Sequence, residues 1–324
     1  MIDLSHALKD GNYFEYPFPH WIIDNFFADE ELSLLNSHFP SSRSMSIDLT
    51  ERSITLAEAI KNNDQITALA AMFDLGLRSS TLREIGSEDN ISRLEKGNGY
   101  SFQDGKTYNR HLSLGTEESS KLRGKNYTKS SEFNNIITTL EDQWTSCLPH
   151  VLDACKEKFD WEFPKAVVDS FFCRGDLRTT SPSSDYGHTT LGPHVDSERE
   201  LFACLIYLRH PEDHSHGGDL ILYEKKPDSP PKFMSSLRRI PMKYLNAAKT
   251  IKYENNKAIL FINHPKKSIH SISSRGSSAW DRRLINLTFE TNGGCFWDKN
   301  QFIDPKLDGQ AAYQKYTSIN ERML

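Results

Sequence analysis

Three side chains that could bind one metal ion stand out in this sequence: His194, Asp196 and His270. His194 and Asp196 are two residues apart, and on an extended strand such residues point to the same face. His270 comes 76 positions later (270 − 194), in another strand-like run. Two imidazoles and one carboxylate on one face of an ion suit ferrous iron and leave its opposite positions open. We therefore expect a catalytic metal site with room for reactants.

Short β-like runs after residue 161 would position these ligands. They are rich in Val, Ile, Leu, Phe and Tyr and are separated by Gly, Pro and Asp turns, which favours a jelly roll over alternating strands and helices. The expected strands are residues 166–173, 193–196, 201–208, 219–223, 258–262, 268–272 and 284–290. The predicted fold class is mainly β with flanking helices (α+β), built on a jelly-roll core.

The rest of the chain is expected to support this core as parts of a single catalytic domain, residues 1–324. Pro149 should kink or split a long helical segment, and the irregular stretch before it is either a substrate-binding segment or a surface insertion. The expected parts are an N-terminal strand and helix (17–40), a mixed insertion (41–130), a supporting helix (131–160), the core (166–290) with a loop insertion (225–253), and a C-terminal tail (296–324) that could include a closing helix at 310–323.

Composition places the chain among soluble globular proteins, with 37% hydrophobic and 26% charged residues. Its net charge of −5 does not indicate the basic face that nucleic acid requires, and no apolar run approaches the roughly 18 residues of a membrane span. The five cysteines are scattered and none lies in a Cys-x-x-Cys pair, so the sequence suggests neither a disulfide framework nor a thiolate zinc site. No secretory signal is visible, so we expect a cytoplasmic protein.

Four motifs in this order resemble the Fe(II)/2-oxoglutarate-dependent dioxygenases of the prolyl-4-hydroxylase-like and phytanoyl-hydroxylase-like kind. They are His194-Val195-Asp196, the apolar strand 201–208, the turn Gly217-Gly218-Asp219-Leu220, and His270 followed by Arg282-Arg283-Leu284-Ile285-Asn286. The resemblance covers residues 166–290 well and residues 17–39 loosely, and it does not extend to the insertion. It implies a double-stranded β-helix, which is the jelly roll of this family.

The resemblance also implies an activity. Decarboxylation of 2-oxoglutarate by O₂ would be coupled to hydroxylation of a substrate C–H bond, with release of succinate and CO₂. His194, Asp196 and His270 would hold Fe(II), and 2-oxoglutarate and O₂ would occupy the open positions. A carboxylate at residue 196, where halogenating members have a small residue, favours hydroxylation over halogenation.

A cation about a dozen residues beyond the second histidine is implied as the anchor for the distal carboxylate of 2-oxoglutarate. Arg282 and Arg283 are both candidates, 12 and 13 residues after His270. Arg282 shares a strand face with Asn286 and Thr288, whereas Arg283 shares the apolar face that should pack against helices. We therefore favour Arg282 and keep Arg283 as the alternative. The bulky residues that follow both arginines depart from the family pattern.

Several alternatives stay open at this point. The chain could be another jelly-roll metalloenzyme that does not use 2-oxoglutarate, or a jelly-roll binding protein without activity. The histidine-rich segment 210–216 is expected to be a solvated loop rather than a metal site, and His264 to be structural. His188 is expected to be an ordinary loop residue rather than a substrate contact, and Arg174 either faces the pocket or is exposed on the surface. The sequence does not name the substrate; we expect an amino-acid-like or other small molecule rather than a protein, with the oligomeric state open.

Overall fold

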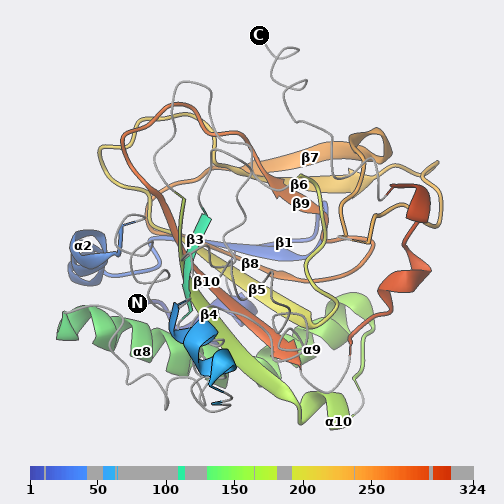
Figure 1. Cartoon of the computed structure of the whole chain (residues 1–324). Coiled ribbons are helices and arrows are strands. Elements are labelled where there is room, and N and C mark those ends of the chain that lie inside the picture. Colours follow the sequence, from blue (N-terminus) through green and yellow to red (C-terminus); the bar gives the residue numbers. More distant parts are fainter. Residues whose placement is uncertain are drawn as a thin grey trace.

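Two antiparallel sheets lie face to face in the computed structural model, and they form the core of the molecule (Figure 1). The larger sheet has the strand order β1-β2-β8-β5-β10-β4-β3, and the smaller has the order β7-β6-β9. The structure describes residues 1–10, 12–41, 54–62, 64, 109–113, 130–163, 165–180, 192–236, 238–291 and 295–307. This is the expected α+β fold with a double-stranded β-helix (jelly-roll) core.

The strand and helix bounds follow the chain in order. The strands are β1 Asn12–Phe14, β2 His20–Asp24, β3 Asn109–Ser113, β4 Phe171–Thr180, β5 Glu200–Tyr207, β6 Leu220–Lys225, β7 Leu245–Ile251, β8 Lys257–Ile262, β9 His270–Ile272 and β10 Arg282–Thr291. The helices are α1 Leu4–Asp10, α2 Asp29–His38, α8 Ser131–Ser146, α9 Leu148–Phe159 and α10 Lys165–Val168. No helix in these described ranges is both long and apolar enough to cross a membrane.

Helices α8 and α9 cover the side of the larger sheet that faces away from the smaller one (Figure 1). The side chain of Ser130 accepts a hydrogen bond from the Phe133 backbone and caps the start of α8. Pro149 lies in the first turn of α9, where its missing N–H costs no hydrogen bond. The long helical segment is therefore split next to this proline, as expected.

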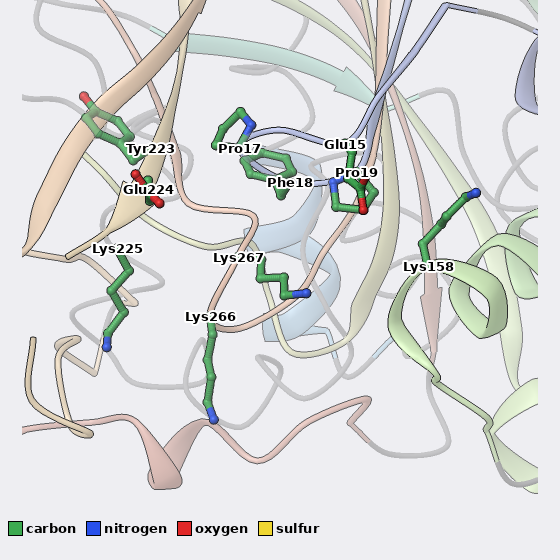
Figure 2. A pocket seen from close by; sticks show the side chains of 10 residues that line it. All are labelled: Glu15, Pro17, Phe18, Pro19, Lys158, Tyr223, Glu224, Lys225, Lys266 and Lys267. Carbon is green, nitrogen blue, oxygen red and sulfur yellow. The ribbon is translucent and has the colours of Figure 1, made fainter. Parts of the chain in front are cut away.

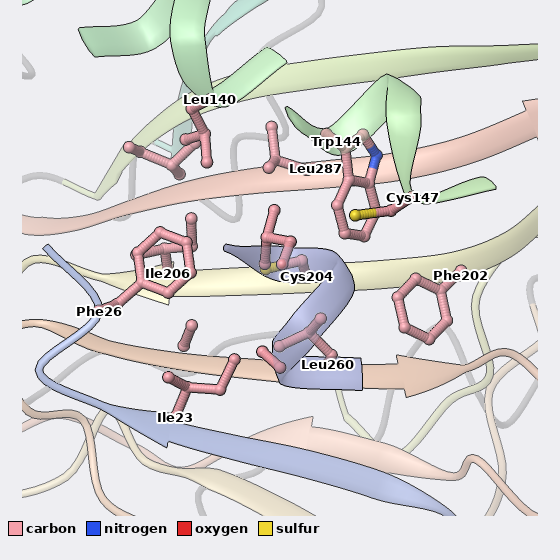
Figure 3. Packing of buried hydrophobic residues seen from close by; sticks show 14 of the residues in the cluster. Ile23, Phe26, Leu140, Trp144, Cys147, Phe202, Cys204, Ile206, Leu260 and Leu287 are labelled. Carbon is pink, nitrogen blue, oxygen red and sulfur yellow. The ribbon is translucent and has the colours of Figure 1, made fainter. Parts of the chain in front are cut away.

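The core beneath these helices is built around Trp144 of α8 (Figure 3). Its ring stacks on Phe289 and Phe202, with centroid separations of 4.8 and 5.5 Å, and its Nε1 donates a hydrogen bond to the Thr288 carbonyl at 3.2 Å. Leu287 of β10 packs in the same cluster. Burial of each large apolar side chain contributes about 1.5–3 kcal/mol, so this layer holds β5 and β10 firmly in place.

Three expected elements were wrong in type or extent. Residues 165–168 form α10, and the strand expected at 166–173 begins only at Phe171, because Ser170 Oγ donates to the Val167 carbonyl and closes a turn. The expected loop 225–253 contains strand β7, whose only buried residues are its two ends, so its sequence lacks the alternation of a half-buried strand. The segment 193–196 contributes isolated bridges at His194 rather than a full strand.

Other predictions fall on residues that the structure does not describe. Most of the insertion 41–130 is among them, apart from residues 41, 54–62, 64 and 130 and strand β3. The closing helix expected at 310–323 and the position of His188 also lie outside the described residues.

Candidate metal centre

His194, Asp196 and His270 meet at one point, as the spacing of their motifs predicted. One ligand atom of each residue lies within 4.8 Å of the other two. The Nε2 atoms of His194 and His270 are each 3.7 Å from a carboxylate oxygen of Asp196, Oδ1 and Oδ2 respectively. Two ligand bonds of about 2 Å can span up to about 4 Å, so one first-row metal ion can bridge Asp196 and either histidine at these 3.7 Å separations. These three residues can therefore converge on one ion.

The Nδ1 atoms of both imidazoles are engaged with backbone carbonyls. His194 Nδ1 donates to the Gly192 carbonyl at 2.8 Å, and His270 Nδ1 donates to the Ser268 carbonyl at 2.9 Å. Each hydrogen bond fixes the proton on Nδ1, so the lone pair of Nε2 faces Asp196. Both rings are thus held in the tautomer that a metal ligand needs.

The backbone brings the two histidines together although they are far apart in the sequence. His194 and His270 exchange two backbone hydrogen bonds, each of 3.0 Å from N to O. On its other side, His194 forms an antiparallel bridge with Arg239. The segment around His194 therefore continues the smaller sheet beyond β9, and the segment around Arg239 continues it by one further step.

Burial shapes the electrostatics of this centre. It lowers the pKa of His194 to about 4, helped by the neighbouring His270 and opposed by Asp196. At neutral pH the His194 ring is therefore uncharged, which is the form that binds metal. The side chains of His194 and Asp196 are 16% and 21% exposed, so an ion can reach them from solvent.

Arg282 lies inside the roll. Its Nε and Nη2 donate to the Gly218 carbonyl at 3.2 and 3.1 Å, and its guanidinium lies over the rings of Tyr253 and Tyr207 at 4.8 and 5.2 Å. None of the described acidic side chains forms an ion pair with it. The positive charge is therefore buried among aromatic rings, with capacity left for an anionic ligand.

Tyr207 is a candidate site residue that the sequence reasoning missed. It is fully buried, and its hydroxyl has no hydrogen-bond partner of normal geometry within the described part of the chain. Burial raises the pKa of Tyr207 to about 12, against the opposing effect of Arg282, so the hydroxyl stays a neutral donor. The only signal was a polar group at an inward position of an otherwise apolar strand.

Arg283 points to the opposite side of β10, as strand parity predicts. Its Nε donates to the Leu208 carbonyl at 3.0 Å. Its Nη1 and Nη2 donate to the backbone and side-chain oxygens of Asn36 in α2, at 3.1 and 2.7 Å. Arg283 thus ties α2 to the larger sheet and lies outside the roll.

The histidine-rich segment 210–216 is largely exposed and forms no metal site among the described residues, as expected, although one of its side chains is fully buried. The Asp213 side chain is fully buried and pairs with Arg275 Nη2 at 2.8 Å and with Arg209 Nε at 3.4 Å. The His210 ring stacks on Trp280, with centroids 3.5 Å apart. This carboxylate already has two cationic partners, so the segment offers no comparable metal site.

His264 has the structural role that was expected. Its ring stacks on Trp161 and Phe159, with centroid separations of 4.8 and 5.1 Å, and burial lowers its pKa to about 4. Arg174 lies in β4, and its side chain is outside what the structure describes.

A separate pocket of about 260 Å³ contains none of the three triad residues (Figure 2). Its lining comes from the segment before β2, the end of β6, α9 and the loop before β9: Glu15, Pro17, Phe18, Pro19, Lys158, Tyr223, Glu224, Lys225, Lys266 and Lys267. Tyr223 donates or accepts a 2.9 Å hydrogen bond with Ser271, which follows His270 and points to the other face of β9. The pocket therefore lies behind the strand that carries His270.

No family model and no curated protein matches the sequence. Solved structures that align with the chain include a prolyl-4-hydroxylase from Pseudomonas putida (8% identity, 88% of this chain and 96% of that chain, TM-score 0.34). Others are a prolyl hydroxylase from Trichoplax adhaerens in complex with a hypoxia inducible factor peptide (10%, 89% and 88%, 0.34) and a 2OG-Fe(II) oxygenase family oxidoreductase from Burkholderia pseudomallei (12%, 67% and 90%, 0.32).

The geometry of the chain itself indicates a class of protein. That geometry consists of two facing antiparallel sheets, a His-x-Asp pair and a later histidine beside it. In these features the chain resembles the Fe(II)/2-oxoglutarate-dependent dioxygenases.

Proposed function

We propose that this protein is an Fe(II)- and 2-oxoglutarate-dependent oxygenase that hydroxylates a C–H bond of a small molecule and releases succinate and CO₂. The observation that carries the proposal is the convergence of His194, Asp196 and His270, with both Nε2 atoms facing the carboxylate. Two neutral imidazoles and a carboxylate that converge at one partly exposed position have few purely structural uses. Burial of such polar groups is unfavourable unless each has a hydrogen-bond partner, an ionic partner or a metal ion.

The donor set fits Fe(II). Two neutral nitrogen ligands and one carboxylate would hold the ion and reduce its formal charge to +1, with the remaining positions open. When bound, Fe(II) would supply the activation of O₂ that oxidises 2-oxoglutarate and the substrate together. The contribution of the chain is to orient both rings through the Gly192 and Ser268 carbonyls and to keep His194 uncharged.

The inner face of β10 and β5 fits 2-oxoglutarate. Arg282 offers a planar pair of donors that matches a carboxylate, and the buried Tyr207 hydroxyl needs an acceptor. A buried donor without a partner costs about 1–3 kcal/mol, and a bound carboxylate would remove that cost. We therefore assign the distal carboxylate of 2-oxoglutarate to Arg282 and Tyr207, and Arg283 has no part in its binding.

The experiment is a measurement of succinate formation. Purified protein would be supplied with Fe(II), 2-oxoglutarate, ascorbate and O₂, with and without pools of small-molecule substrates. Succinate above the metal-free background is expected, with a further rise when a substrate is present. If Fe(II) binds tightly and 2-oxoglutarate is never consumed, a jelly-roll metalloenzyme with another co-substrate would replace this proposal.

The Asp196→Ala variant provides the residue-level control. It removes the only charged ligand, so substrate-coupled turnover should be lost. Undiminished turnover in this variant would contradict the assignment of Asp196 as a ligand.

A further inference from the structure

We propose that Arg239 binds an anionic group of the substrate, and that the substrate is therefore a small molecule that carries a carboxylate. This inference rests on the proposed function, since it names the class of molecule that the oxygenase site would accept. It starts from the position of Arg239 beside a metal ligand, on the side of the triad away from Arg282.

Arg239 and His194 are direct neighbours across two antiparallel segments. Val195 N donates to the Arg238 carbonyl at 3.3 Å, and Ile240 N donates to the Pro193 carbonyl at 2.8 Å. His194 and Arg239 are directly opposite each other between these two hydrogen bonds. This is the narrow type of antiparallel pair, in which the Cα atoms are about 4.5 Å apart and both side chains project from the same face. The Arg239 side chain therefore starts from the metal-binding face, next to His194.

The order of the segments separates Arg239 from Arg282. Across the smaller sheet the order is β7, β6, β9 with His270, then His194, then Arg239. Arg282 contacts Gly218, just before β6, and Tyr253, just after β7. The metal ligands thus lie between the two arginines, so an anion held by Arg239 would be a different group from the one held by Arg282.

The backbone around Arg239 is held in place by a tight turn. Ser235 N donates to the Arg239 carbonyl at 2.9 Å, Arg239 N donates to Ser235 Oγ at 3.3 Å, and Ser235 is fully buried. Arg238 within this turn has a left-handed backbone, with φ of 62°. Left-handed residues other than glycine persist only where their surroundings enforce them, so the base of the Arg239 side chain is preorganised.

The neighbouring Arg238 has a different role. Its Nη1 donates to Glu198 Oε2 at 3.2 Å, and Lys299 Nζ lies 3.6 Å from the other oxygen of the same carboxylate. Arg238 is opposite Val195, whose side chain lies in an apolar cluster and not at the metal centre. These two consecutive arginines therefore provide a matched pair for an experiment.

Arg239 suits a carboxylate for a chemical reason. A guanidinium presents two parallel N–H donors to a planar oxyanion, and such charge-assisted pairs fix orientation as well as affinity. An oxygenase has to hold one C–H bond of its substrate beside the metal. An anchor next to a metal ligand fixes that position well, because the anchored group and the reacting C–H bond are then close together. A free amino acid or a comparable carboxylic acid fits this arrangement.

The test compares carboxylic acids with matched neutral compounds on the full chain. The probes are the free L-amino acids, their amides and their decarboxylated amines. Binding is measured by calorimetry with protein loaded with Mn(II) and 2-oxoglutarate, and turnover is measured as succinate release with Fe(II). At least one acid should bind ten-fold or more tightly than its amide and should stimulate succinate release more strongly. Equal binding of acids and amides would overturn the inference.

Variants assign the preference to a residue. In Arg239→Gln the preference for acid over amide should disappear, and in Arg239→Lys, which keeps the charge without the fork, it should be reduced. Arg238→Gly removes an equal charge one residue away and suits the left-handed backbone, so the preference should remain. A preference that survives Arg239→Gln, or that Arg238→Gly abolishes equally, would overturn the assignment.

The calorimetry separates this inference from the proposed function. If no probe releases succinate but acids bind more tightly than amides through Arg239, the proposed activity fails and the anion site stands. If succinate is released and amides serve as well as acids, the activity stands and the anion site fails.

Discussion

Arg282 and Arg283 are consecutive in β10 and make their hydrogen bonds on opposite sides of the larger sheet. Arg282 donates to Gly218 inside the roll, and Arg283 donates to Asn36 of α2 on the helical side. Since neighbouring strand residues alternate between faces, only one of the two can reach a ligand at the triad. The same pair therefore supplies both a functional variant and its structural control.

Arg282→Leu should weaken binding of 2-oxoglutarate by ten-fold or more, because hydrogen bonds to charged groups contribute about 1.5–3 kcal/mol. Anaerobic titration can follow this through the visible charge-transfer absorption of a 2-oxo acid chelated to Fe(II). Arg283→Leu should lower the free energy of unfolding and leave the 2-oxoglutarate affinity nearly unchanged. Equal loss of affinity in both variants would contradict the assignment.

Arg275→Met should lower the free energy of unfolding by about 3–5 kcal/mol, because it leaves the buried Asp213 carboxylate without its closest cation. Denaturation in guanidinium chloride measures the change. The control is Lys156→Met, since the ion pair of Lys156 with Glu162 is largely exposed, at 66% and 71%, and should contribute nothing measurable. Similar values for the two variants would show that the Asp213 cluster is not buried as described.

Two alanine substitutions in the turn before β6 should differ in severity. Both Gly217 and Gly218 have positive φ, of 77° and 74°, so alanine is strained at either position by roughly 1–2 kcal/mol. At Gly217 the added Cβ would also overlap the Ser274 carbonyl oxygen, whereas at Gly218 its nearest neighbour is the Arg282 side chain at 3.3 Å. Gly217→Ala should therefore lower the midpoint of thermal unfolding more than Gly218→Ala, and the reverse order would contradict the turn geometry.

The free energy of unfolding should decrease as the pH falls from about 6.5 to about 4. Burial lowers the pKa of both His20 and His264 from 6.5 to about 4, so in this range the unfolded chain binds protons that the folded chain does not. Urea denaturation at a series of pH values measures the slope. In His264→Phe, which keeps a ring between Phe159 and Trp161, the slope should fall by up to about 1.4 kcal/mol per pH unit, the value for one proton. An unchanged slope would show that His264 is protonated in the folded chain.

The convergence of His194, Asp196 and His270 could be predicted from the sequence because its signal is local. A His-x-Asp pair in an extended segment shows by its spacing that both side chains share a face, and the parity of β10 separates Arg282 from Arg283 in the same way. The jelly roll was also predictable, because most core strands are short apolar runs between turn residues.

The other site candidates depend on pairing between distant segments, and a single sequence does not show which segments pair. Tyr207 is notable only because Arg282 lies beside it, and Arg239 only because its segment pairs with His194. That segment belongs to a stretch that was expected to be a loop, and β7 in the same stretch buries only its ends. Tertiary contacts, and not local patterns, determine these features.

The most direct test of the triad is an anaerobic titration of the metal-free protein with Fe(II) in the presence of 2-oxoglutarate. The charge-transfer absorption should saturate at one iron per chain in the wild type. It should be absent in His270→Ala, where one of the two nitrogen ligands is missing, while the His264→Phe variant should saturate like the wild type. No absorption in the wild type, or an undiminished one in His270→Ala, would contradict a metal centre formed by His194, Asp196 and His270.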